Sequence, residues 1–455
     1  MYSVIEKAIS KPSAGSEQGI TRRSFGSTFE WGVSTAAFQV EGSNKADGRG
    51  ASIWDTFCDV TGNIADGSNG EVACDHYNRW QQDFELLTQL GVTAYRFSIA
   101  WPRVQPLGSG DWNEKGFEFY GRMLDDLASR GIHAHVTLNH WDLPQALQDK
   151  GGWANRDTVL RFRDYACEVG RRFGDRCTSL VTHNEPWVVA MLGHDSGIFA
   201  PGIKDRAVAM QVSHHLLLSH GMALKWLRGN GVKAKLGIVL NLSPFYAASV
   251  SKEDQSKTRI EDGMLVRWYL DPLLKGHYPA DILRHLGSAA PRIEPGDMEI
   301  ISQPLDFLGV NYYTRSVVSA GNTWSPKTQG LPVSDMGWEI YPNGLTELLL
   351  RLHRDYLLPP VYITENGAAF PDKVEGGTVD DFDRVRYLRD HIAALAKARQ
   401  AGIDVRGYFV WSLLDNFEWA SGYVKRFGIV HVDYATQQRT LKSSAHWYAD
   451  FLRGN

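Results

Sequence analysis

The chain has 455 residues, of which 43% are hydrophobic and 22% charged, a composition typical of a globular protein. Its net charge of −4 leaves no basic field for nucleic acid or an anionic membrane. It has no apolar run of about 18 residues or more, so we expect no membrane-spanning helix.

The first 24 residues differ from the rest. They are rich in Ser, Gly, Lys and Gln and lack sustained periodicity, which predicts a partly ordered N-terminal extension (1–24). The remainder (25–455) has the length of a single α/β barrel, so we expect one catalytic domain there.

Apolar strand candidates alternate with amphipathic helical stretches along the chain. The predicted strands are Phe29–Val40, Ala94–Ile99, Ala134–Asn139, Leu180–Asn184, Leu236–Leu242, Phe307–Asn311, Val361–Thr364 and Gly407–Trp411. The predicted helices include a segment around Trp80, Phe84 and Leu87, then Phe117–Arg130, Thr158–Phe173, Ala207–Gly229, Gly344–Tyr356 and Asp380–Ala401. Glycines 91, 131, 174 and 402 are predicted to end four of these helices. The alternation predicts an α/β fold, a single (β/α)₈ TIM barrel with elaborated βα loops, the longest after the first, fifth and sixth strands.

Two of these strands end in a glutamate. Glu185 follows Leu180–Asn184, and Glu365 follows Val361–Thr364. Because the carboxyl ends of parallel barrel strands lie at the same end of the barrel, both glutamates are predicted to lie on one rim. Two carboxyl groups close together are what cleavage of a glycosidic bond requires. Pro186 should hold Glu185 extended, and Asn366-Gly367 should form a turn behind Glu365.

Several separated motifs resemble the family 1 glycoside hydrolases, the β-glucosidase family. They occur in the expected order from about Phe29 to Leu452: Trp31–Gly42, Tyr95–Ser98, Asn139–Pro144, Asn184–Pro186, Asn311–Thr314, Thr364–Gly367 and Trp411–Trp419. The resemblance implies that Glu365 is the nucleophile and Glu185 the acid/base of a retaining mechanism, with carboxyl groups about 5–5.5 Å apart. It also implies that Arg96 and Tyr313 hold the nucleophile, and that the Trp411-Ser412 peptide is cis.

The resemblance carries over a substrate-binding set as well. Its members are Gln39, His140, Asn184, Trp411, Glu418 and Trp419. Further candidates for substrate binding are Asn311, Trp141, Trp338 and Phe427, and core packing is the alternative role for the last three. Polar groups around an aromatic floor suit a sugar ring with many hydroxyls. Glu418 would repel a 6-phosphate, although Lys425 and Arg426 lie nearby in sequence. On the aglycone side, Trp187 is a candidate as well as Trp141 and Trp338.

Other arrangements of reactive residues predict no cofactor and no metal. His133, His135 and His140 invite a metal interpretation, but only the first two share a strand face, and no carboxylate spacing completes a site. The four cysteines fit no zinc pattern and suggest reduced thiols in a cytoplasmic protein. Cys58 and Cys74 are the one pair whose positions in a loop region leave a disulfide open.

The sequence therefore predicts a retaining β-glucosidase, an O-glycosidase that releases terminal β-D-glucosyl residues through a covalent glycosyl-enzyme intermediate. Its expected substrates are small β-glucosides or short β-glucan oligosaccharides, in cellulose degradation, with no nucleic acid or membrane partner; a homo-oligomer stays open. A β-galactosidase, a β-fucosidase or a transglycosylase would use the same two carboxylates. A sugar-binding homologue without activity would typically lack one of them.

Overall fold

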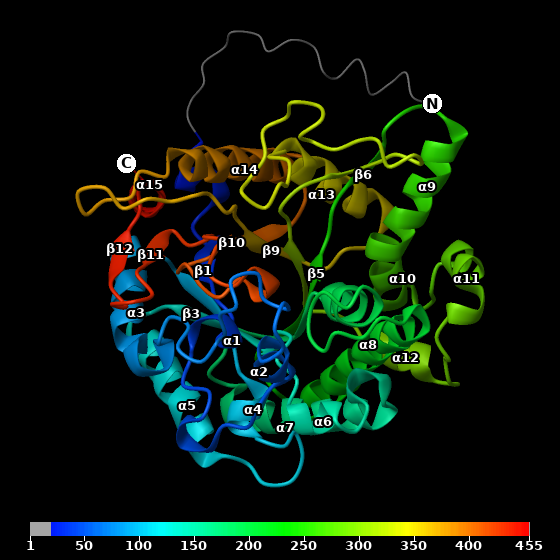
Figure 1. Ribbon diagram of the computed structural model, residues 1–455, viewed down its shortest axis with the longest axis horizontal. Coiled ribbons are helices and arrows are strands. Elements are labelled where there is room, and N and C mark those ends of the chain that lie inside the picture. The colour runs from blue at the N-terminus through cyan, green and yellow to red at the C-terminus, as the bar shows by residue number, and fades with distance from the viewer. Residues whose placement is uncertain (1–19, 455) are drawn as a thin grey trace.

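A closed barrel of eight parallel strands lies at the centre of the computed structural model, which describes residues 20–454 (Figure 1). Around the barrel the strands pair in the order β1-β10-β9-β7-β5-β4-β3-β2. They are β1 Glu30–Ser34, β2 Ala94–Ser98, β3 His133–Asn139, β4 Ser179–Asn184, β5 Lys235–Asn241, β7 Phe307–Asn311, β9 Val361–Asn366 and β10 Val405–Trp411. The predicted TIM barrel is confirmed.

Helices surround the barrel and connect its strands (Figure 1). The longer ones are α3 His76–Leu90, α5 Glu114–Ser129, α7 Arg156–Phe173, α8 Arg206–Gly229, α13 Asn343–Asp355, α14 Phe382–Gln400 and α15 Ser443–Arg453. Gly91, Gly131 and Gly402 have φ of 73°, 69° and 93°, so these glycines end helices in the left-handed conformation expected of them. Gly174 also follows its helix but keeps a right-handed φ of −59°.

Large side chains fill the inside of the barrel. Ala94, Val181, Val239, Phe307, Tyr362 and Phe409 form one buried cluster, contributed by six different strands. Gly32 makes room for it, because a Cβ there would lie 2.4 Å from Phe409 Cδ1. The barrel is therefore a packed core, and a ligand site can form only beyond the strand ends.

The first predicted strand is too long. Strand β1 stops at Ser34, and Ala37–Val40 form the short helix α1, although the sequence predicts one strand to Val40. The turn begins where Ser98 Oγ accepts a hydrogen bond from the Ala37 N–H at 2.7 Å. A contact with the neighbouring strand thus ends β1, and it places Gln39 on a helix at the rim.

Long connections cover the carboxyl ends of the strands. The one after β1 runs to α3 and includes α2 Ile53–Cys58; the one after β7 runs to α13. The segment after β5 holds α9 Lys252–Asp262, α10 Trp268–Lys275, α11 Ala280–Leu286 and α12 Asp297–Ile301. A parallel pair, β6 Phe245–Ala247 and β8 Ser316–Val318, ties the last two connections together. The predicted long loops after the first, fifth and sixth strands are confirmed.

Smaller elements complete the description. They are α4 Trp101–Val104, α6 Gln145–Gln148, the π-helices Val188–Asp195 and Gly263–Arg267, and the hairpin strands β11 Val430–Val432 and β12 Arg439–Leu441. The predicted N-terminal extension falls mostly on residues 1–19, outside the described part. From residue 20 onward, a 3₁₀ turn at Arg22–Phe25 contacts α15, because Arg22 Nη1 donates to the Leu452 carbonyl at 2.9 Å.

Cys58, Cys74, Cys167 and Cys177 are all free thiols, so the disulfide left open for the first two does not form. Across residues 20–454, no helix combines the length and the apolar character needed to cross a lipid bilayer.

Candidate active site

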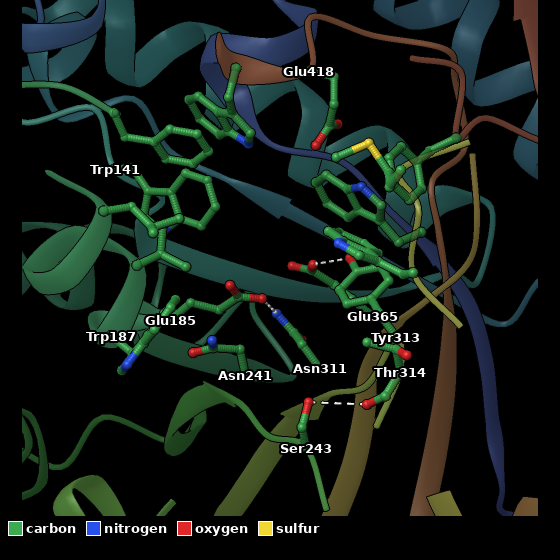
Figure 2. Close-up of a pocket in the computed structure, with 18 of the residues that line it drawn as sticks. Trp141, Glu185, Trp187, Asn241, Ser243, Asn311, Tyr313, Thr314, Glu365 and Glu418 are labelled. Atoms are coloured by element: carbon green, nitrogen blue, oxygen red, sulfur yellow. Dashed lines mark hydrogen bonds between the residues drawn. The ribbon is translucent and has the colours of Figure 1, made fainter. Parts of the chain in front are cut away.

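A pocket opens at the carboxyl ends of the barrel strands, and most of the predicted site residues line it (Figure 2). The predicted residues on its wall are His140, Trp141, Glu185, Trp187, Asn311, Tyr313, Trp338, Glu365, Trp411, Glu418, Trp419 and Phe427. Gln39, Arg96 and Asn184 do not line the pocket. They lie directly behind the wall, where they hold residues that do.

Glu365 is buried on β9 and held by two donors. Arg96 Nη1 donates to its Oε1 at 2.7 Å, and the Tyr313 hydroxyl donates to its Oε2 at 2.6 Å. Burial raises the pKa of Glu365, and the Arg96 charge and the Tyr313 hydrogen bond act in the opposite direction. Both oxygens are therefore fixed, and the ionised form has strong partners.

Glu185 faces the same space with a different set of partners (Figure 2). Within residues 20–454 its side chain has one hydrogen bond, which Asn311 Nδ2 donates to Oε1 at 2.6 Å. Burial, and after it the negative charge of Glu365, raises the pKa of Glu185 to about 8. Because Glu365 has the cation and the phenol, the proton shared by this pair resides on Glu185 at neutral pH.

The predicted extended backbone at Glu185 is wrong. Glu185 has a φ of 48°, in the left-handed region, and Pro186 starts a helical segment immediately after it. Proline disfavours the right-handed helical region for the residue before it, and β4 ends in an irregular register against β5 that turns the chain here. The Glu185 N–H donates to the Val239 carbonyl at 2.9 Å, which stabilises this uncommon conformation.

Asn184 links the two carboxyl groups from behind. Its Oδ1 accepts from Arg96 Nη2 at 2.7 Å and from Asn311 Nδ2 at 3.1 Å. These donors fix the amide, so its Nδ2 donates to His140 Nε2 at 3.1 Å. The proton of neutral His140 is therefore on Nδ1, which has no hydrogen-bond partner among residues 20–454. Burial, followed by the Arg96 charge, holds the pKa of His140 well below its usual value.

Gln39 and Glu418 provide further polar atoms at the pocket wall or directly behind it. Gln39 Nε2 donates to Asn416 Oδ1 and to the Phe417 carbonyl, each at 2.9 Å. Its buried Oε1 has no hydrogen-bond partner in the described part of the chain. Glu418 lies 3.4 Å from Gln39 Nε2. Burial, and then the charge of Glu365, raises the pKa of Glu418 to about 8. These atoms are suited to exchange hydrogen bonds with a polar ligand.

Aromatic rings form the floor and sides of the pocket. Trp411 and His140 stack at 5.7 Å with an interplanar angle of 14°, and Trp141 packs on Trp419 at 4.5 Å. Trp141 and Trp419 have positive φ values of 80° and 50°, so tertiary contacts hold their backbones in an uncommon conformation. The peptide between Trp411 and Ser412 is cis, as the resemblance implies.

Part of the outer wall of the pocket was not predicted from the sequence. The additional lining residues are Val188, Leu192, Phe199, Asn241, Leu242, Ser243, Thr314 and Met336. Two of them carried a usable signal: Asn241 is a polar residue near the end of a predicted strand, and Thr314 belongs to the Asn311–Thr314 motif. Most of the others lie on connecting segments, whose course over the rim depends on contacts with distant parts of the chain.

The three histidines considered for a metal site do not meet. His133 lies at the start of β3 with its Nδ1 2.8 Å from Glu30 Oε1, and His135 is 2.9 Å from the same carboxyl group. His140 follows the other end of that strand. In the part of the chain from residue 20 to 454, no three His, Cys, Asp or Glu side chains come together as metal ligands.

Known proteins share both the sequence and the fold. The model for "Glycosyl hydrolase family 1" matches residues 21–455. "Beta-glucosidase A" of Acetivibrio thermocellus is 46% identical, over 96% of this chain and 100% of its own length. A "Bifunctional beta-D-glucosidase/beta-D-fucosidase" of Bifidobacterium breve is 42% identical, over 93% and 97%. The structure of "Family 1 b-glucosidase from Thermotoga maritima" superposes with a TM-score of 0.91 at 47% identity, over 94% and 98%. With this fold, this pocket and a family match over nearly its whole length, the chain belongs to glycosyl hydrolase family 1.

Proposed function

We propose that the protein is a retaining β-glucosidase in which Glu365 is the nucleophile and Glu185 the general acid/base. The carrying observation is the contrast between the two buried carboxyl groups of one pocket. Glu365 bonds a guanidinium and a phenol, whereas Glu185 bonds one amide and faces the charge of its partner. This asymmetry supplies one ionised and one protonated group. The predicted separation of about 5–5.5 Å between the carboxyl groups stays a prediction.

The proton cycle follows from this contrast. Ionised Glu365 attacks the anomeric carbon while Glu185 protonates the departing oxygen, so the glycosidic bond breaks and a glycosyl ester forms on Glu365. The ester has no negative charge, so one cause of the raised pKa of Glu185 disappears. Glu185, now ionised, removes a proton from water as the water attacks the anomeric carbon, and Glu365 leaves as a carboxylate.

The unpaired polar atoms support an unphosphorylated glycone. His140 Nδ1 and the Glu418 carboxyl group belong to residues of the pocket wall and are available to sugar hydroxyls, and Gln39 holds Glu418 from directly behind the wall. The two cations that follow in sequence are already engaged. Lys425 contacts Asp335 at 3.0 Å, and Arg426 pairs with Asp415 at 2.7 Å. A 6-phosphate would therefore lie beside the carboxyl group of Glu418, and neither Lys425 nor Arg426 would be free to neutralise it.

The outer half of the pocket is mainly apolar and supports a variable aglycone. Trp187, Leu192, Phe199, Met336 and Trp338 provide this surface, with Asn241 and Ser243 as polar points. Such a lining accepts aryl groups and the apolar face of a second glucose. We infer small β-glucosides and short β-glucan oligosaccharides as substrates, and therefore a contribution to cellulose degradation.

β-Fucosidase activity is the second candidate, because the relative from Bifidobacterium breve bears both activities in its name. A panel of nitrophenyl β-glucoside, β-galactoside, β-fucoside and 6-phospho-β-glucoside, compared by kcat/KM, separates the candidates. We expect the glucoside to be among the best substrates and the 6-phosphoglucoside the poorest. A clear preference for the phosphorylated sugar would reject the glycone assignment.

Covalent labelling tests the nucleophile directly. A 2-fluoro glucoside with a good leaving group should inactivate the enzyme and leave its sugar on Glu365. The fluorine slows both chemical steps and the good leaving group speeds only the first, so the glycosyl-enzyme ester accumulates. Peptide mapping by mass spectrometry locates the label. A label on any other residue would overturn the assignment.

The cellular setting is also part of the proposal. We infer a cytoplasmic location, supported by four cysteines that are all free thiols. We further infer that residues 25–455 act as one catalytic domain, and the family match over residues 21–455 supports this. Cell fractionation tests the cytoplasmic location. The activity of a shortened chain that begins at residue 21 tests whether the single domain is sufficient for catalysis.

A further inference from the structure

Thr364 is buried on β9 immediately before Glu365, and it does not line the pocket. Its hydroxyl donates to Oδ1 of Asn311 on the neighbouring strand β7 at 2.6 Å. The register between β7 and β9 is irregular at Val310 and Asn311, which brings the Asn311 side chain to this position. Gly309 also leaves space, because a Cβ there would lie 3.0 Å from Thr364 Cγ2 and 3.1 Å from its Oγ1.

This hydrogen bond orients the Asn311 amide. With Oδ1 bound to the Thr364 hydroxyl, the NH₂ group faces the other side, where it donates to Glu185 Oε1 at 2.6 Å and to Asn184 Oδ1 at 3.1 Å. Asn184 Oδ1 is an acceptor already bound by Arg96. A rotated Asn311 would place its own oxygen against two acceptors whenever Glu185 is ionised.

We propose that Thr364 is a positioning residue, which holds the Asn311 N–H on Glu185 and so eases release of the proton that Glu185 carries. The inference rests on the proposed function, in which Glu185 alternates between acid and base. An N–H donor favours the ionised carboxylate, so the Thr364–Asn311 pair opposes the burial that keeps Glu185 protonated. The second chemical step needs that ionised form.

Other charged and titratable groups around Glu185 also affect its proton. They are Glu365 on β9, Arg96 on β2, Glu418 after β10, and Tyr313 and His140 on the pocket wall. None of them contacts the Thr364 hydroxyl, whose one side-chain partner among the described residues is Asn311. Substitution at Thr364 therefore changes the position of Asn311 and leaves these charges in place.

The test is the pH dependence of Thr364→Val, which keeps the shape of threonine and removes the hydroxyl. We expect the basic limb of kcat/KM on a nitrophenyl β-glucoside to move up by about 0.7 pH unit, the equivalent of one ordinary hydrogen bond. With a dinitrophenyl glucoside, hydrolysis of the glycosyl-enzyme limits turnover, and this step needs ionised Glu185 as the base. The acid limb of kcat should therefore also move to higher pH. Thr364→Ser restores the hydroxyl and should return both limbs to wild-type positions.

Ser34→Ala is the matched control. Ser34 is also fully buried, and its hydroxyl donates to the Thr364 carbonyl at 2.9 Å, so its loss disturbs the same strand end without touching Asn311. Its limbs should stay in place. Unmoved limbs in Thr364→Val, an equal shift in the serine variant or an equal shift in the control would each overturn the inference. If Thr364→Val does not fold, Thr364→Ala is measured instead; failure of both to fold would mark a structural role and also overturn it.

Failure of the proposed function would look different. If the wild type is not labelled on Glu365 by the 2-fluoro glucoside, the two-carboxylate assignment fails before any Thr364 variant is compared. If labelling succeeds and the limbs of Thr364→Val remain those of the wild type, only the role of Thr364 is rejected.

Discussion

Removal of the Tyr313 hydroxyl should change the proton affinity of the nucleophile. In Tyr313→Phe, the hydrogen bond of 2.6 Å to Glu365 Oε2 is lost, and Arg96 remains on the other oxygen. The ring keeps its packing, because Trp338 and Phe427 lie 5.3 and 6.1 Å from it. The substitution therefore isolates one donor to one buried carboxylate.

The structure allows the size of the effect to be worked out. A hydrogen bond to a charged group contributes about 1.5–3 kcal/mol, which corresponds to about 1–2 pKa units if it is specific for the ionised form. The Tyr313 hydroxyl acts in that direction, since it lowers the pKa of Glu365. Its loss raises that pKa, so Glu365 becomes protonated at a higher pH. The acid limb of kcat/KM, which reports the essential base of the free enzyme, should therefore move up by about 1–2 units.

Kinetics on a nitrophenyl β-glucoside between about pH 4 and pH 9 measures this limb. Tyr312→Phe is the matched control, because Tyr312 is the neighbouring buried tyrosine and its hydroxyl donates to the Tyr341 carbonyl at 2.6 Å, away from both carboxyl groups. An acid limb in Tyr313→Phe that coincides with the wild type, or an equal shift in the control, would refute the reasoning.

Three further predictions concern the acid/base and the support of the pocket. The basic limb of wild-type kcat/KM should fall near pH 8, because the pKa of Glu185 is raised to about 8 and only its protonated form assists the leaving group; a limb below about pH 6 would contradict this. Glu185→Ala should retain a fast first step on activated aryl glucosides and regain turnover with azide, which needs no general base; no response to azide would count against the assignment. Asp415→Ala should lower the free energy of unfolding by about 3–5 kcal/mol, measured in urea, because buried Lys442 contacts Asp415 at 2.7 Å; a loss under about 1 kcal/mol would be inconsistent with that pair supporting the loop of Glu418.

Much of the site was predictable because a parallel barrel brings all its strand ends to one rim. Glu185 and Glu365 stand at the ends of two apolar stretches, so once the alternation of strands and helices predicts a barrel, their meeting follows from topology. These inferences needed only local patterns and the order of elements along the chain.

The remaining features depend on contacts between distant segments. No local pattern predicts that the Asn311 amide bonds Glu185, or that Arg96 divides its guanidinium between Glu365 and Asn184. The irregular registers at the ends of β4 and β7 arise from pairing between strands, and they set the backbone of Glu185 and the reach of Thr364. The outer wall, including Phe199 and Met336, depends on how long connections fold over one another.

The amino-acid sequence thus determined which two carboxyl groups face each other, because the alternation of apolar strands and amphipathic helices predicts a closed parallel barrel. The family resemblance implied which of the two keeps the proton, but the physical reason for it lies only in the tertiary structure. Proton affinity depends on burial and on charges within a few ångströms, and in this protein those neighbours come from strands far apart in the chain.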